Sequence, residues 1–295
     1  MSLVDPKVLD RIGGYALFSR TVVEGFISGL HRSMFHGFGS EFVQYRRYVP
    51  GDDLKYVDWK VYSRTKKLVS KVFREETNMN CRIVLDCSAS MSYKGENSEF
   101  SKLEFASIVI ACLSYLISKQ GDKVGFYSYA NEIISAIPTG SGQRHLQEIF
   151  AAMGKLKAEG TGNHKDCLNQ IAEGFKGRGL VIFVTDMMED EEEILRFLKS
   201  CRFSHNDCIL MQILDNDEIE FPFSKNVRFI GMENKQELTT APEMVREHYQ
   251  TNLNSYLENI RTQCRMNQVD YCLINSAERL EHALAAYLHK REELH

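Results

Sequence analysis

The chain has 295 residues, which suits one large domain with an additional segment, or two domains. Hydrophobic residues make up 43% of it and charged residues 26%, so it can bury a sizeable core, and these fractions do not indicate disorder. The formal net charge of −4 argues against a molecule that binds nucleic acid over its whole surface.

The first 80 residues contain two kinds of pattern. Apolar side chains recur at helical spacing over residues 5–34, which predicts an amphipathic helical lead-in. From residue 36 to 78 the chain has glycines, a Pro-Gly-Asp-Asp turn and short aromatic or β-branched stretches. Residues 69–73 alternate like a strand. These features predict a small, β-rich part led by a helix.

From residue 81 onward, apolar runs of strand length alternate with segments of helix length. Strands are expected at residues 81–86, 123–130, 179–186, 208–214 and 271–275. Helices are expected at residues 103–119, 142–154, 164–175, 191–201 and 242–267, with a last one ending near residue 291. This alternation predicts an α/β fold with a mostly parallel sheet covered by helices on both faces. We therefore divide the chain into residues 1–79 and residues 80–295.

The eight cysteines show no CxxC pair, and several lie in apolar runs, such as Cys112. Such cysteines are typical of reduced, buried thiols in a cytosolic protein. No segment reads as a signal peptide or as a membrane span, because the longest apolar run, residues 108–117, is far shorter than the roughly 20 residues that a spanning helix needs. We therefore expect a cytoplasmic protein.

Two of the expected strands end in aspartate, and hydroxyl side chains accompany them. Asp86 is followed by Ser88 and Ser90 at alternate positions, Thr161 lies in a glycine-flanked loop, and Asp186 ends the second strand. In parallel sheets, binding sites lie beyond the carboxyl ends of the strands. Carboxylate and hydroxyl oxygens suit Mg²⁺ or Mn²⁺. The alternative is that Asp and Ser cap helices here without any metal.

This order of residues resembles the metal-ion-dependent adhesion site of von Willebrand factor A domains. The resemblance implies that Ser88 and Ser90 bind the metal directly and that Asp86 and Asp186 bind it mostly through water. Thr161 would bind directly or through water. The resemblance also implies one open coordination position on the metal, which a carboxylate of a protein partner completes. The expected fold is accordingly von Willebrand factor A-like, a Rossmann-type arrangement.

A second resemblance covers about residues 35–295. The segment 37–64 is similar to the signature of a bacterial family called domain of unknown function 58, through Gly37, Gly39, Glu41, Phe42, Arg46, Tyr48, Gly51, Asp52, Asp53, Asp58, Trp59 and Arg64. Many relatives carry membrane helices at the N-terminus, whereas this chain would be a soluble member. The family's genes tend to accompany MoxR-type AAA+ ATPases, which implies such an ATPase, or a client protein presenting a carboxylate, as partner.

The signature residues allow two interpretations. Asp52, Asp53, Asp58 and Arg64 form a partner surface in one of them. In the other, residues 50–53 only form a tight turn, and Trp59 is a buried anchor.

Two other functions compete with a non-enzymatic binding module. A metal-dependent hydrolase or phosphatase would use Asp86, but Ser88 stands where a haloacid dehalogenase-type enzyme needs a second Asp. His145 and His164 lie near the site loops, and we interpret them as solvated rather than catalytic. The alternative of a single-stranded nucleic-acid binder rests on basic and aromatic side chains that are interleaved over residues 45–67. Acidic residues alternate with them, which weakens this alternative. We favour the binding module, without nucleic acid and without enzymatic activity.

Overall fold

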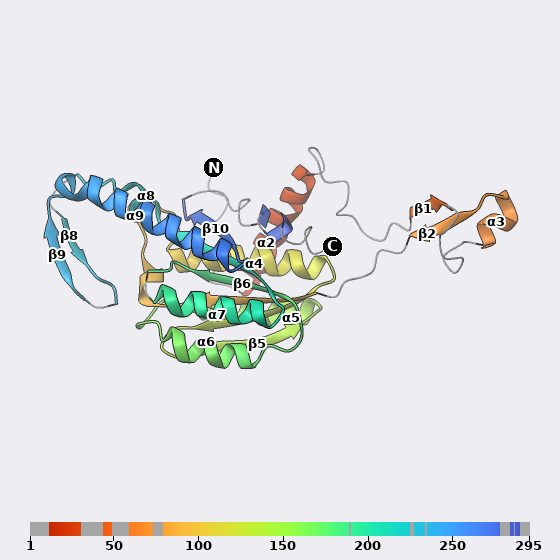
Figure 1. The fold of residues 1–295 in the computed structure, drawn as a ribbon, viewed down its shortest axis with the longest axis horizontal. Coiled ribbons are helices and arrows are strands. Elements are labelled where there is room, and N and C mark those ends of the chain that lie inside the picture. Colours follow the sequence, from red (N-terminus) through yellow and green to blue (C-terminus); the bar gives the residue numbers. More distant parts are fainter. Residues whose placement is uncertain are drawn as a thin grey trace. The chain divides into compact units, whose positions relative to one another are not determined.

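The computed structural model of the chain describes residues 12–30, 44–48, 59–72, 79–188, 190–224, 227–233, 235–277, 284–285 and 287–289 (Figure 1). The chain forms two compact units, one of residues 1–24 with 78–295 and the other of residues 25–77. The division at residues 79 and 80 stays a prediction. Helix α2 (Ile12–Leu30) contributes its first part to the larger unit, where the ring of Tyr15 lies 6.4 Å from that of Phe150.

The smaller unit contains strand β1 (Gln44–Arg47), helix α3 (Trp59–Thr65) and strand β2 (Val69–Val72). The two strands pair antiparallel. Trp59 is 57% exposed and meets Tyr62 edge-on at 6.1 Å, so the interpretation of Trp59 as a buried anchor is wrong. Gly37, Gly39, Glu41, Phe42, Gly51, Asp52, Asp53 and Asp58 lie outside the described residues.

The larger unit is built on a six-stranded sheet in the order β10-β7-β6-β3-β4-β5. Its strands are β3 (Asn80–Asp86), β4 (Lys123–Tyr129), β5 (Ile133–Gly140), β6 (Leu180–Thr185), β7 (Asp207–Leu214) and β10 (Asp270–Asn275). All pairs are parallel except β4 with β5. The chain runs outward from β3 in one direction and then returns to β6 on its other side. This reversal is the switch point of a doubly wound sheet, where binding crevices form.

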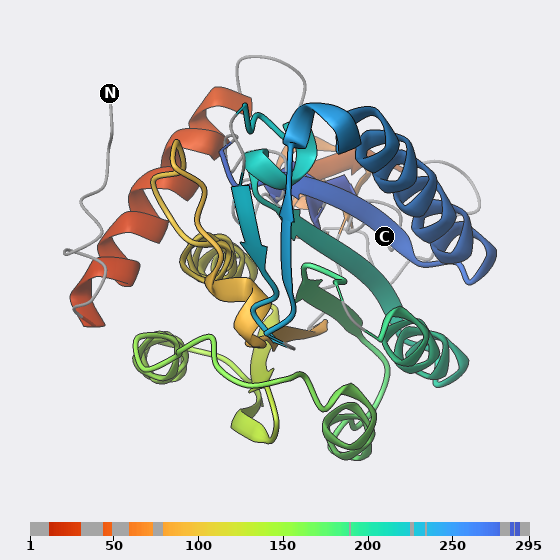
Figure 2. The same ribbon diagram turned by 90° about the vertical axis from the view of Figure 1, so that its left-hand side faces the viewer.

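Helices cover both faces of this sheet (Figure 2). Helices α4 (Lys102–Lys119) and α5 (Gln143–Met153) pack on one face. The other face carries α6 (His164–Glu173), α7 (Glu191–Phe203) and α9 (Pro242–Met266), whose buried side chains join those of β3, β6 and β7 in one core cluster. Strands covered on both faces must be apolar along their whole length, and β6 and β7 are buried at every position. The predicted fold class is confirmed.

Five described elements of the larger unit were not predicted. They are the edge strand β5, the 3₁₀ helix η2 (Ala89–Ser92), helix α8 (Asn216–Glu220) and a hairpin of β8 (Val227–Ile230) and β9 (Glu237–Thr240). The hairpin stands between α8 and α9 and pairs antiparallel. Within the described ranges, no helix combines the length and the apolar character that crossing a bilayer requires. None of the eight cysteines, all of them in described positions, forms a disulfide, and seven are buried.

A buried arginine stabilises the edge of the sheet at which the parallel strands begin. Arg82 on β3 is 1% exposed, and its guanidinium donates to the Asn206 side-chain oxygen at 2.8 Å and to the Gly177 carbonyl at 3.0 Å, with a further bond to the Lys176 carbonyl. It also lies 4.9 Å from the centre of the Phe175 ring. Burial lowers the pKa of Arg82. These neutral partners join β3 to the loops that precede β6 and β7.

Replacing Arg82 with Met should lower the free energy of unfolding by about 2–4 kcal/mol, because it leaves buried acceptors without a donor. Urea unfolding followed by circular dichroism measures the change. Arg196→Met is the matched control, since Arg196 is exposed and forms a surface ion pair with Glu193, so its replacement should cost at most about 1 kcal/mol. Equal costs for the two variants would contradict a structural role of Arg82.

Candidate functional site

Asp86 lies at the carboxyl end of β3, beside the switch point of the sheet. Its side chain is 1% exposed, and both carboxylate oxygens accept hydrogen bonds. Oδ1 accepts from the backbone N–H of Ser88 at 2.9 Å, and Oδ2 accepts from the Thr185 hydroxyl at 2.9 Å. Because β6 runs parallel beside β3, Thr185 ends its strand next to Asp86. The carboxylate is therefore fixed between the two strand ends.

Ser88 and Ser90 follow Asp86 in a loop that leads into η2. Ser88 is 2% exposed and Ser90 is half-buried. Their hydroxyl oxygens lie 3.1 Å apart. The structure thus brings Asp86, Ser88 and Ser90 together, as the alternate spacing predicts.

Asp186 follows β6 and is also 1% exposed. Its Oδ1 accepts from the backbone N–H of Met188 at 3.2 Å, and its Oδ2 accepts from the ammonium of Lys102 at 2.8 Å. The ammonium also contacts Glu218 of α8 at 2.7 Å. Lys102 thus forms an ion triad with these two carboxylates, and its side chain is fully buried. Asp186 is therefore already paired with a cation of the chain itself.

Thr161 lies in a loop that is bonded to the Asp86 loop through its backbone. The N–H of Ala89 donates to the Gly160 carbonyl at 2.9 Å, and the N–H of Glu159 donates to the Cys87 carbonyl at 3.1 Å. The Thr161 side chain itself is exposed and its hydroxyl donates to Asn131 at 3.4 Å. The loop is thus joined to the site, whereas the hydroxyl is engaged elsewhere.

Burial and nearby charges set the protonation of Asp86. Burial raises the pKa of Asp86, the charge of Asp186 raises it further, and His164 opposes the rise. His164 is 2% exposed and its Nδ1 lies 2.8 Å from the Tyr129 hydroxyl, so the interpretation of His164 as a solvated residue is wrong. His164 is the first residue of α6, and its burial depends on the contact with Tyr129, which lies on another strand.

Strand β7, like β3 and β6, leads into a buried aspartate. Asp215 follows β7 and accepts hydrogen bonds from the Ser98 hydroxyl at 2.6 Å, the Ser276 hydroxyl at 3.2 Å and the Gly95 N–H at 3.1 Å. These bonds lower the pKa of Asp215 although burial opposes them. A Cβ on Gly95 would lie 2.4 Å from the Asp215 carboxylate, so this close approach requires glycine. Asp215 holds the loop before α4 in place.

Sequence reasoning missed Lys102, Glu218 and Asp215. Asp215 could have been found, because it ends the apolar run of β7 as Asp86 and Asp186 end theirs. Lys102 gave no such signal, since a lysine in the first turn of a helix is usually exposed. Among the described residues, no three His, Cys, Asp or Glu side chains lie at metal-ligand spacing.

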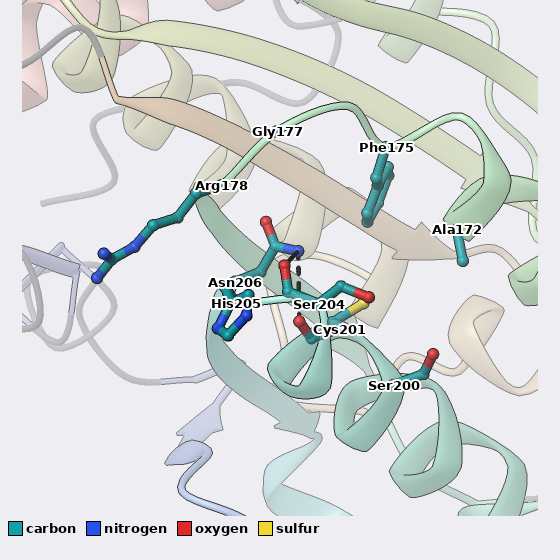
Figure 3. A pocket seen from close by; sticks show the side chains of 9 residues that line it. All are labelled: Ala172, Phe175, Gly177, Arg178, Ser200, Cys201, Ser204, His205 and Asn206. Atoms are coloured by element: carbon teal, nitrogen blue, oxygen red, sulfur yellow. Dashed lines mark hydrogen bonds between the residues drawn. The ribbon is translucent and has the colours of Figure 1, made fainter.

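A separate pocket of about 370 Å³ lies at the amino-terminal end of the strands, away from the site (Figure 3). It is lined by Ala172, Phe175, Gly177, Arg178, Ser200, Cys201, Ser204, His205 and Asn206. Arg178 extends away from the other lining side chains. The nearby guanidinium of Arg82 is engaged by backbone carbonyls and Asn206. We therefore place the candidate site at the carboxyl ends of β3 and β6.

Comparisons with known proteins agree with the sequence resemblance. The model of a family described as protein of unknown function DUF58 matches residues 44–257. Uncharacterized proteins of Mycobacterium bovis and Mycobacterium tuberculosis are each 24% identical over 221 residues, which cover 74% of this chain and 68% of the relative.

Solved structures with a similar fold have low sequence identity. The conserved hypothetical protein BatB of Bacteroides thetaiotaomicron matches with a TM-score of 0.49 and 15% identity, covering 73% of this chain and 99% of that one. An aerotolerance-related membrane protein of Bacteroides fragilis matches with a TM-score of 0.48 and 19% identity, covering 72% and 98%. The VWA domain of SpRpn10 matches with a TM-score of 0.41 and 12% identity, covering 71% and 94%.

Replacing Lys102 with Met should destabilise the fold by about 3–5 kcal/mol near neutral pH, because two buried carboxylates lose their cation. Burial already raises the pKa of Glu218, with Lys102 opposing the rise. Without the ammonium that pKa rises further, so Glu218 is protonated more readily and the cost should shrink as the pH falls below neutral.

Urea unfolding at several pH values measures this dependence. Lys119→Met is the control on the same helix, since Lys119 is 44% exposed and lies 4.0 Å from Glu24. A Lys102→Met variant whose cost is small, or is the same at every pH, would show that the triad does not carry the charge balance described here.

Proposed function

The chain belongs to the family described as protein of unknown function DUF58, and from that premise we propose that it is a non-enzymatic protein-interaction module that binds a partner through one divalent metal. The metal would be Mg²⁺ or Mn²⁺, held at the carboxyl ends of β3 and β6. Ser88 and Ser90 would be direct ligands, and Asp86 and Asp186 would support them. Thr161 would contribute from its loop.

The observation that carries this proposal is the paired hydroxyls beside buried carboxylates. Neighbouring ligands of an octahedral Mg²⁺ at about 2.1 Å are about 3 Å apart. The hydroxyl oxygens of Ser88 and Ser90 lie 3.1 Å apart, so they fit two adjacent ligand positions. Among the residues that the structure describes, no lysine or arginine pairs with buried Asp86, whereas Asp186 is paired with Lys102. The donor set is entirely oxygen, which suits a hard cation.

A bound metal would supply a Lewis-acidic centre that captures an acidic side chain. The chain's own residues fix the position: Thr185 and the Ser88 N–H orient Asp86, and the Gly160 carbonyl anchors the loop at Ala89. Lys102 neutralises part of the negative charge beside the site. With fewer uncompensated carboxylates close by, the metal would keep more of its charge for a partner's carboxylate.

The partner that the family resemblance favours is a MoxR-type AAA+ ATPase, with this chain as an adaptor or co-chaperone in assembling or activating a protein complex. A client protein that presents a carboxylate is the second kind of partner. Both fit the same site, because either would fill an open position on the metal.

The geometry does not favour a hydrolase that uses Asp86 as nucleophile. Both of its oxygens are engaged in hydrogen bonds, and the side chain is 1% exposed. The ammonium of Lys102 is likewise committed, to Asp186 and Glu218. An attacking carboxylate must reach its substrate, which a side chain held in this way does not.

Mg²⁺ at a hundredfold excess over its dissociation constant should stabilise the wild-type protein by about 2.7 kcal/mol. The Asp86→Asn variant should fold but lose most of this stabilisation, because the neutral amide no longer supports the cation. Differential scanning fluorimetry with Mg²⁺ and with chelator measures the effect. Glu148→Gln removes one exposed carboxylate from α5 and should keep the full shift. A full shift in Asp86→Asn would place the cation elsewhere.

In affinity capture from the native host, the wild-type protein in Mg²⁺ should enrich an AAA+ ATPase. Chelator and the Asp86→Asn substitution should each abolish the enrichment, because the partner's carboxylate then has no metal to bind. Mass spectrometry of the captured proteins makes the comparison. An ATPase enriched equally in Mg²⁺ and in chelator would show that the contact does not depend on the metal.

A further inference from the structure

The β8–β9 hairpin brings a third carboxylate to the candidate site. Glu233 lies in the turn of this hairpin, and its Oε1 accepts a hydrogen bond from the backbone N–H of Ser90 at 3.3 Å. The two residues are 143 positions apart in the chain. Both ribbon views place the turn of the hairpin next to the segment that contains η2 (Figures 1 and 2). The contact is therefore made by the fold and not by local sequence.

The turn holds Glu233 in a defined position. The N–H of Gly231 donates to the Gln236 carbonyl at 2.7 Å, and the N–H of Lys235 donates to the Gly231 carbonyl at 2.9 Å. Lys235 adopts a left-handed conformation with φ of 54°, which closes the turn. Below it, the Arg228 guanidinium donates to the Glu237 carboxylate across the strands at 2.9 Å. The hairpin is thus a hydrogen-bonded element that presents its turn to the site.

The second oxygen of Glu233 has an unusual environment. Oε2 is buried and has no hydrogen-bond partner among the residues that the structure describes. A buried carboxylate oxygen without a partner is costly, because the charge has lost its hydration. Oε1 already satisfies the N–H of Ser90, so capping of η2 does not account for Oε2. A cation beside the serine hydroxyls would satisfy it.

We propose that Glu233 is an additional ligand of the metal site, so that the chain's own hairpin occupies the position otherwise open to a partner. This inference rests on the proposed metal site, which it deepens by naming a ligand and an internal competitor. A partner carboxylate would then bind by replacing Glu233, and the hairpin would have to move away from Ser90. The alternative role of Glu233 is to cap η2 through Oε1 alone.

The test uses Mn²⁺ as probe with the full chain. Electron paramagnetic resonance of free Mn²⁺ gives the dissociation constant, and water-proton relaxation reports how many waters bind the ion. The variants are Glu233→Ala and Glu233→Gln, and the Gln side chain can still accept from the Ser90 N–H if the Ala variant folds poorly. Glu237→Gln is the matched control, since it removes an exposed carboxylate of the same hairpin.

Glu233→Ala should weaken Mn²⁺ binding by at least about tenfold and raise the water relaxation per bound ion, because water replaces the carboxylate oxygen. Glu233→Gln should weaken binding in the same direction, and Glu237→Gln should leave both readouts unchanged. Wild-type affinity and relaxation in both Glu233 variants, with binding lost in Asp86→Asn, would overturn the role of Glu233 and leave the metal site standing. No Mn²⁺ binding by the wild-type protein, or unchanged binding in Asp86→Asn, would overturn the metal site and this inference with it.

Discussion

The arrangement of the site depends on how buried negative charge is balanced at the carboxyl end of the sheet. Three adjacent strands, β3, β6 and β7, each lead into an aspartate that is buried with little access to water. Each carboxylate has a different partner: backbone and hydroxyl donors for Asp86, the ammonium of Lys102 for Asp186, and the loop before α4 for Asp215. The ion triad of Lys102 therefore fixes α4 and α8 against the strand ends, and among these three aspartates it pairs only Asp186 with a cation.

This asymmetry is the reason we propose a cation site beside β3 rather than beside β6 or β7. Asp215 receives enough hydrogen bonds to stay charged without a cation, as its lowered pKa indicates. Asp86 receives fewer, and burial raises its pKa. The serine hydroxyls 3.1 Å apart lie directly after it. If Glu233 also binds the ion, the site is closed by the same chain that builds it, and access for a partner depends on a two-stranded hairpin.

Sequence reasoning predicted the parts of this structure that depend on local pattern. The buried strands β3, β6 and β7 were predicted because parallel strands covered on both faces are apolar throughout. Asp86 and Asp186 followed, since they end such strands. Strand β5 was missed because it is a half-exposed edge strand containing Pro138. Lys102 and Glu233 were missed for another reason: their partners lie 84 and 143 residues away, and only the fold brings them together. The burial of His164 likewise depends on Tyr129 of a different strand.

The most direct test of the central claim is to locate the cation. Crystals grown with Mn²⁺ give an anomalous scattering signal that marks the ion independently of any assumed ligands. The account predicts a peak at roughly 2.0–2.2 Å from the hydroxyl oxygens of Ser88 and Ser90 and close to the Asp86 carboxylate. A peak at another place on the chain, or none at saturating Mn²⁺, would contradict it.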